Sequence, residues 1–193
     1  MVSTLVFSIP ATEHSPALHF HVNPMYCLYH YLVKEGRRAP EQRDPATAEA
    51  ASLAAGVREP RGLHGHWSVW EQPLTTSGTP EEAAEGLQTA MMATADRLGE
   101  ALRQAEAVFL EKLWPRRVAL VEAALALLRE GFAPHFPAMA RRQAELLELD
   151  WPPEIDAFLA PDSYGGSYSH PLTVGVTELT GRAQELALCE TVL

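Results

Sequence analysis

Histidines two residues apart occur twice in the sequence, at His19-x-His21 and at His64-x-His66. On a β-strand such a pair presents both imidazoles on one face. Neutral imidazole nitrogen is a common ligand for zinc and other divalent metals, so the four histidines are candidate metal ligands. Because no carboxylate stands at a fixed spacing beside either pair, we favour a plainer interpretation. In that interpretation one histidine of each pair is solvated and the other is hydrogen-bonded.

A polar, glycine-containing loop supplies the second group of candidate residues. Residues 160–171 contain Tyr164, Tyr168 and His170. Binding residues lie disproportionately on loops that a rigid scaffold positions. We therefore expect residues 160–171 to form a flexible loop in which Tyr164, Tyr168 and His170 bind substrate.

Several familiar chemical motifs are absent from the sequence. It contains no G-x-S-x-G nucleophile elbow, no P-loop and no G-x-G-x-x-G motif, which disfavours nucleotide chemistry. Its two cysteines, Cys27 and Cys189, are too few for a disulfide framework or a cysteine zinc site. The aromatic cluster at residues 26–31 is expected to be ordinary core and rim packing rather than a ligand pocket.

Charge and hydropathy exclude other classes of protein. Fifteen Lys and Arg residues stand against 25 Asp and Glu residues, which gives a net charge of −10 and argues against nucleic-acid partners. No apolar run approaches the roughly 20 residues that cross a bilayer, and the first residues lack the basic segment of a secretory signal. We therefore expect a cytoplasmic protein without nucleic-acid or membrane partners.

The elements that must position these residues can be read from periodicity and capping signals. Extended segments are expected at residues 3–9, 17–22 and 172–177, with 17–22 the clearest because apolar residues alternate there with histidines. Asn23 and Pro24 predict the start of a first helix that ends at Gly36. Further helical segments are expected at residues 45–55, 80–114, 118–131 and 137–149, in a short piece between Pro153 and Pro161, and from Thr180 onward.

One of these helices is expected to be the spine of the domain. Thr79 to Glu82 have the form of a capping box, and a single apolar stripe continues from there to Leu113. At 1.5 Å per residue this predicts one helix of about 50 Å that ends at Pro115. The residues beyond Pro115 either continue it with a kink or form a new helix that turns back.

The C-terminal stretch resembles a known family. A loop with tyrosines and a histidine, then the strand at 172–177, then a helix over Gly181–Leu193 is similar to the region that precedes the zinc motif in HExxH, or zincin-like, metallopeptidase-like proteins. The resemblance implies that the strand is the edge along which a peptide lies. It also implies that the helix continues into His-Glu-x-x-His, where the histidines bind zinc and the glutamate activates water.

That motif does not occur in the 193 residues. The last helix ends on the apolar residues Val192 and Leu193 and has no basic residue, Gly or Asn in its last turn. We therefore expect a chain that lacks its metal-binding part, holds no cofactor itself and would need zinc only together with a downstream part.

The sequence thus predicts one α+β domain over residues 1–193. It is mostly helical, with a long central helix, a helical hairpin or bundle, a small sheet, and a surface excursion at residues 34–62. The favoured function is the scaffold and substrate-edge part of a zinc metallopeptidase-like hydrolase, inactive alone, with a peptide ligand and self-association through the C-terminal helix. The alternatives are a non-enzymatic helical interaction protein and a histidine-based metal-binding module.

Overall fold

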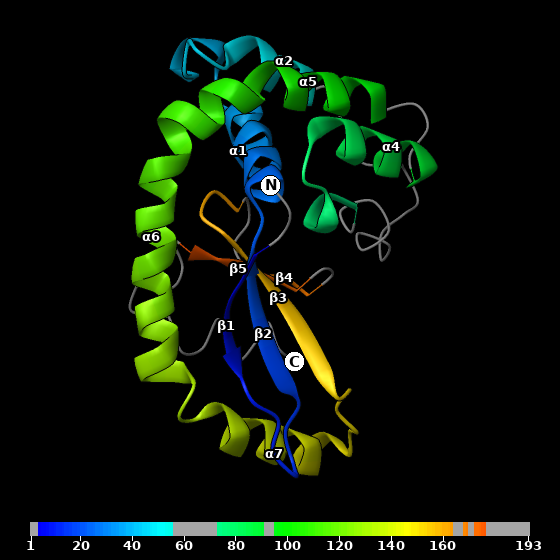
Figure 1. Ribbon diagram of the computed structural model, residues 1–193, viewed down its shortest axis with the longest axis vertical. Helices are drawn as coiled ribbons and strands as arrows, with labels where there is room; N and C mark the ends of the chain where they lie inside the picture. The colour runs from blue at the N-terminus through cyan, green and yellow to red at the C-terminus, as the bar shows by residue number, and fades with distance from the viewer. Residues whose placement is uncertain (1–3, 56–72, 91–94, 164–167, 170–171, 177–193) are drawn as a thin grey trace.

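A five-stranded mixed sheet runs through the middle of the structure, with helices arranged around it (Figure 1). The computed structural model describes residues 4–55, 73–90, 95–163, 168–169 and 172–176. The strands are β1 (Thr4–Ile9), β2 (Ala17–Val22), β3 (Glu154–Ala160), β4 (Tyr168–Ser169) and β5 (Leu172–Gly175). Their order is β1-β2-β3-β5-β4; β2, β3 and β5 are parallel, while β1 and β4 are antiparallel to their neighbours.

The first two strands agree with the sequence prediction and form a hairpin. In β2, Leu18, Phe20 and Val22 are buried, whereas His19 and His21 are half-buried on the opposite face. The two-residue alternation in the sequence therefore corresponds to a sheet with one apolar and one polar face.

Strand β3 corrects the sequence prediction of a short helical piece between Pro153 and Pro161. Glu154–Ala160 instead form the central strand, paired in parallel with β2 on one side and with β5 on the other. Ala157 and Leu159 point into the core. Local preference is overridden here because a strand buried between two neighbours is stabilised by partners that are distant in the sequence.

Helix α1 (Pro24–Arg37) begins where the sequence predicts. The side chain of Asn23 accepts hydrogen bonds from the backbone N–H groups of Met25 and Tyr26 at 2.8 and 3.2 Å. Gly36 lies inside the last turn of α1 and does not end the helix. A Cβ atom there would lie 2.7 Å from the carbonyl oxygen of Ala51 in α2 (Ala48–Ala55). The glycine therefore permits close packing of these two helices.

The single spine helix predicted over residues 80–114 is wrong. Helix α4 (Pro80–Ala90) and helix α5 (Ala95–Val108) pack against each other as two helices (Figure 1). The contact is close enough that a Cβ atom at Gly99 would lie 2.7 Å from that of Ala84. The predicted helical hairpin is thus present, but α4 and α5 form it within residues 80–114, where the apolar stripe predicted a single helix. The predicted cap is present as well, since the backbone N–H of Glu82 donates to Thr79 Oγ1 at 3.2 Å.

Pro115 bends the helical path without ending it. After α5 come a π-helical segment, η2 (Phe109–Leu113), then α6 (Trp114–Leu127) and a second π-helical segment, η3 (Leu128–Phe132). Pro115 lies in the first turn of α6, where its missing N–H costs least. In Figure 1 the chain changes direction between α5 and α6, which places α6 beside the sheet. Helix α7 (Phe136–Leu147) then crosses the end of the sheet that is remote from α1.

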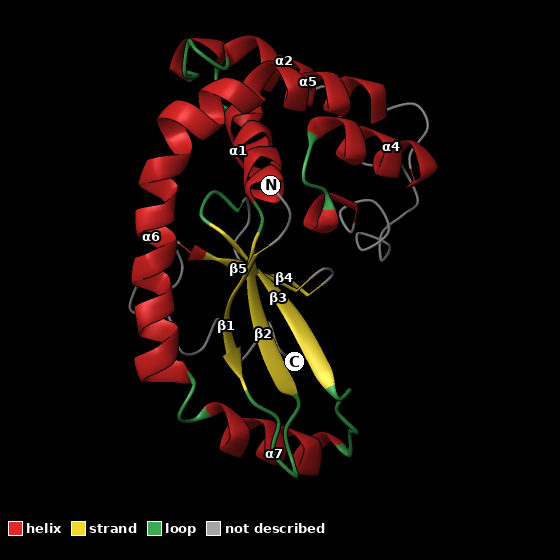
Figure 2. Cartoon of the chain, in the orientation of Figure 1, coloured by secondary structure: helices red, strands yellow, loops and turns green. Residues whose placement is uncertain are grey.

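The apolar stripe of α5 faces the interior. Leu98, Leu102, Ala105 and Phe109 are each at most 1 % exposed, within a core shared with α1 and α2. Figure 2 shows how far helix predominates over strand, and the α+β, mostly helical fold class is confirmed. Among the helices that the structure describes, none combines the length and apolar character needed to span a membrane.

Candidate functional site

The sheet ends at β4, which contains one of the predicted substrate-binding residues, Tyr168. Tyr168 pairs with Thr173 and Ser169 with Leu172, antiparallel to β5. Strand β5 lies between β3 and β4, so the expectation that residues 172–177 form the open edge is wrong where these strands pair. Two extended segments close together in sequence tend to pair with each other, and this pairing moves the edge to Tyr168–Ser169.

The opposite edge of the sheet, β1, is irregular and is contacted by an arginine. The register of β1 against β2 shifts between Leu5 and Phe7, and a β-bulge of this kind interrupts regular pairing. The Arg129 guanidinium, from η3, donates to the carbonyl oxygen of Val6 at 3.3 Å and lies 5.3 Å from the centroid of the Phe7 ring. Within the described part of the chain neither edge strand, β1 or β4, has a strand paired to its outer side, but β1 carries the irregular register and the Arg129 contact.

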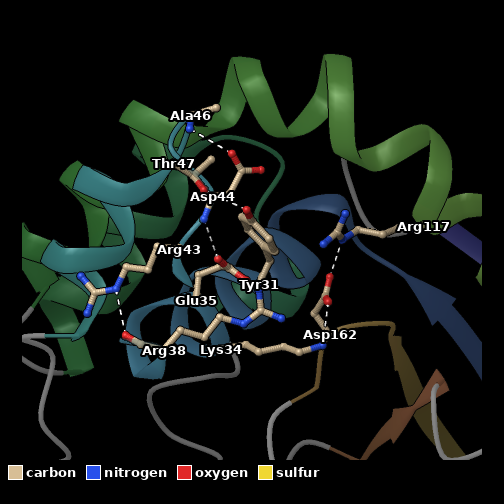
Figure 3. Close-up of polar contacts among 10 residues, drawn as sticks. All are labelled: Tyr31, Lys34, Glu35, Arg38, Arg43, Asp44, Ala46, Thr47, Arg117 and Asp162. Atoms are coloured by element: carbon tan, nitrogen blue, oxygen red, sulfur yellow. Dashed lines mark hydrogen bonds and ion pairs between the residues drawn. The ribbon is translucent and has the colours of Figure 1, made fainter. Parts of the chain in front are cut away.

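Three charged side chains fix the point where the chain leaves β3 toward β4. Asp162 follows β3 by two residues, Lys34 lies in the last turn of α1, and Arg117 lies in α6. Lys34 Nζ is 3.1 Å from Asp162 Oδ1, and Arg117 Nε forms an ion pair with Asp162 Oδ2 (Figure 3). The side chains of Arg117 and Asp162 are only 14 % and 12 % exposed. We call these three residues the Asp162 cluster.

Aromatic rings support the guanidinium of this cluster. Arg117 Cζ lies 4.7 Å from the centroid of the Tyr31 ring and 5.5 Å from that of Phe109, which are cation–π distances. The Tyr31 hydroxyl is 2.8 Å from Thr47 Oγ1, and burial raises the pKa of Tyr31. A guanidinium is well suited to a partly buried ion pair because it stacks on aromatic faces while it pairs with a carboxylate.

Polar groups also lie between α1 and the sheet. The Tyr26 hydroxyl is 2.7 Å from Thr173 Oγ1, and Cys27 Sγ donates to the carbonyl oxygen of Leu159 at 3.5 Å. Burial raises the pKa of the Cys27 thiol and lowers the pKa of His30 to about 3. A thiol with a raised pKa forms little of the nucleophilic thiolate, and an imidazole with a pKa near 3 is a weak base, so neither group is activated for catalysis. These residues hold α1 on the sheet and belong to the core.

The metal-ligand candidates that the structure describes, His19 and His21, bind neighbouring strands. His19 Nδ1 is 2.8 Å from Ser8 Oγ in β1, and His21 Nε2 is 2.7 Å from Asp156 Oδ1 in β3. The His21 ring also stacks on Phe158 at 5.4 Å between centroids. Within the described ranges, no three or more His, Cys, Asp or Glu side chains are arranged to hold a metal ion.

The remaining candidate residues have different outcomes. His64, His66, Tyr164 and His170 lie outside the described residues, and Tyr168 is placed only by its backbone in β4. Asp156 was not predicted as a site residue, although Ile155, Ala157 and Leu159 alternate with it as they would in a strand. The Asp162 cluster was not predicted either, because its three residues come from distant segments and share no pattern in the sequence.

Comparison with known proteins adds no assignment: no protein-family model matches the chain, and no match was found among curated proteins or solved structures.

Proposed function

We propose that the chain is the substrate-binding scaffold of a zinc metallopeptidase-like hydrolase and that it holds an extended peptide along β4. The supporting observation is the end of the sheet, where β4 is an antiparallel edge strand paired only with β5 in the described part of the chain. An edge strand presents a row of backbone N–H and C=O groups, and an extended peptide pairs with them by strand addition. Peptides are therefore the ligand class that this chemistry recognises best.

Rigid surroundings favour the same proposal. Strand β5 is paired on both sides, and its residues Leu172, Thr173 and Val174 are buried. The Asp162 cluster fixes the chain where the connection to β4 begins. A pre-positioned edge loses less conformational entropy on binding than a free segment does. In this proposal Tyr168, together with Tyr164 and His170, selects the peptide side chains.

Hydrolysis needs groups beyond those that the structure describes. The chain contains no His-Glu-x-x-His, so within this proposal the zinc ligands and the general base come from residues other than these 193. The chain alone then binds peptide without cleaving it. A cytoplasmic location is part of the same proposal, consistent with the free, buried Cys27.

The test uses a fluorescein-labelled peptide of alternating Val and Thr and the same peptide N-methylated at alternate residues. We expect saturable binding by fluorescence anisotropy, and slower hydrogen exchange at Tyr168 and Ser169 in the complex. The N-methylated peptide should bind at least about tenfold more weakly, because it lacks the donors that strand addition uses. The amides of β1 serve as the control and should not change.

Two results would contradict the proposal. Protection at β1 and not at β4, or equal binding of the two peptides, would mean that the edge strand does not hold the peptide. Zinc-dependent, chelator-sensitive cleavage of labelled casein by the chain alone would mean that the metal site lies within it.

A further inference from the structure

A groove of about 640 Å³ lies at the end of the sheet that is remote from α1. One wall is the turn between β1 and β2, residues 11–16, and the other is formed by α7 and the segment that leads from it to β3 (Figure 1). Apolar groups form much of its lining, among them Ala11, Pro16, Ala144, Leu149 and Pro153.

Exposed leucines gather at the same place. Leu146 and Leu147 in the last turn of α7, and Leu149 just after it, are 63 %, 52 % and 44 % exposed. The first half of α7, by contrast, buries Phe136 and Ala140 in the core. Clustered exposed apolar side chains of this kind mark interaction surfaces. We call the groove together with these three leucines the α7-end surface.

The α7-end surface is acidic. Three carboxylates, Glu13, Glu145 and Asp150, and one cation, Arg141, line the groove, and Glu148 lies between two of the exposed leucines. Glu145 is near two arginines of α7, 3.8 Å from Arg141 and 3.3 Å from Arg142. Asp150 and Glu148 form no ion pair within the described residues. The surface therefore carries uncompensated negative charge beside exposed apolar side chains.

We propose that the α7-end surface docks a basic amphipathic helix of a partner protein. Such a helix places apolar side chains against the leucines and in the groove, and its lysines or arginines face the carboxylates. A small molecule that fits the groove would leave Leu146 and Leu147 in water, because these residues do not line it. A second copy of the chain is disfavoured by charge, since a two-fold contact would bring the same carboxylates together between chains of net charge −10.

The probe is a fluorescein-labelled Leu/Lys peptide of about four helical turns with an amphipathic repeat, compared with its Leu/Glu counterpart. We expect the Leu/Lys peptide to bind at least about tenfold more tightly than the Leu/Glu peptide by anisotropy. The triple substitution Leu146→Ser, Leu147→Ser and Leu149→Ser should weaken binding by about tenfold or more. Each of these side chains is exposed, so the variant should fold, which circular dichroism checks.

Matched control variants distinguish binding at the α7-end surface from nonspecific hydrophobic binding elsewhere on the protein. Leu120→Ser with Leu127→Ser alters two α6 leucines of similar exposure, 45 % and 41 %, and should leave binding within about twofold. A further pair of variants tests charge.

In that pair, Glu13→Gln with Asp150→Asn should weaken binding, whereas Glu111→Gln in η2 with Glu122→Gln in α6 should not. Absence of binding, or equal losses in the α7-end and control variants, would overturn the proposal. A dimer by light scattering that the triple substitution makes monomeric would also overturn it, in favour of a second copy as the occupant.

Discussion

Replacing Asp162 with asparagine removes the carboxylate that Lys34 and Arg117 share. Because Arg117 and Asp162 are 14 % and 12 % exposed, the change leaves a guanidinium charge largely buried without its counter-charge. Removing one partner of a buried ion pair costs about 3 to 5 kcal/mol. Asparagine keeps the size of the side chain and one acceptor oxygen, so we expect a loss near the lower end, about 3 kcal/mol.

Substitutions of the other two members of the Asp162 cluster, Lys34 and Arg117, should have unequal costs in stability. The Lys34 side chain is 36 % exposed, so Lys34→Met should cost only about 0 to 1 kcal/mol. Arg117→Met also removes the stacking on Tyr31 and a hydrogen bond to the carbonyl oxygen of Leu113, so its cost should equal or exceed that of Asp162→Asn. The double variant of Arg117 and Asp162 should cost much less than the sum of the single changes.

Urea unfolding followed by tryptophan fluorescence measures these free energies of unfolding. A cost below about 1 kcal/mol for Asp162→Asn, or additive single changes, would refute the assignment of a buried, coupled pair. The same variant tests the link to β4. If the cluster positions the edge strand, Asp162→Asn should speed hydrogen exchange at Tyr168 and Ser169 and weaken binding of the Val/Thr peptide.

Four further predictions concern other parts of the chain. Leu102→Ala should cost about 2 to 5 kcal/mol in urea unfolding, whereas the same change at the exposed Leu120 should cost little. The pKa of His30 is lowered from 6.5 to about 3, so the unfolded chain takes up the proton first as pH falls. Protonation of His30 should therefore lower stability as pH falls between those two values, and His30→Gln should make the fall in stability shallower. Calorimetry should show only weak zinc binding, and a tight stoichiometric site lost on His19→Ala or His64→Ala would reverse this expectation. Glu148, at φ 52°, should be replaceable by glycine with a gain of up to about 1 kcal/mol in thermal unfolding, whereas Glu148→Ala should bring no such gain.

Local signals account for the elements that the sequence predicts correctly. The Asn23 side chain accepts from N–H groups two and three residues away, and Thr79 Oγ1 accepts from the N–H group three residues away at the start of α4. The alternation in β2 likewise lies within six residues. Patterns of this range are visible in the sequence because both partners of each interaction fall in one short window.

The elements that the sequence predicts wrongly depend on partners that are distant along the chain. The apolar stripe over residues 80–114 is consistent with one long helix or with two helices packed together. The choice depends on what α4 and α5 pack against. In the structure α5 packs on α1 and α2, and Gly99 allows α4 to approach α5 closely. Periodicity reports which side of a helix is apolar and not whether the helix continues.

Strand β3 shows why the candidate site is harder to predict than the fold class. Its pairing with β2 brings Asp156 beside His21, and its carboxyl end places Asp162 between α1 and α6. Its pairing with β5 leaves β4 as the outer strand. The edge strand and the ion pairs near it thus both depend on one strand that pairs only with distant segments. A substitution that weakens β3 pairing should therefore disturb Asp162 and β4 together while leaving the locally capped start of α1 intact.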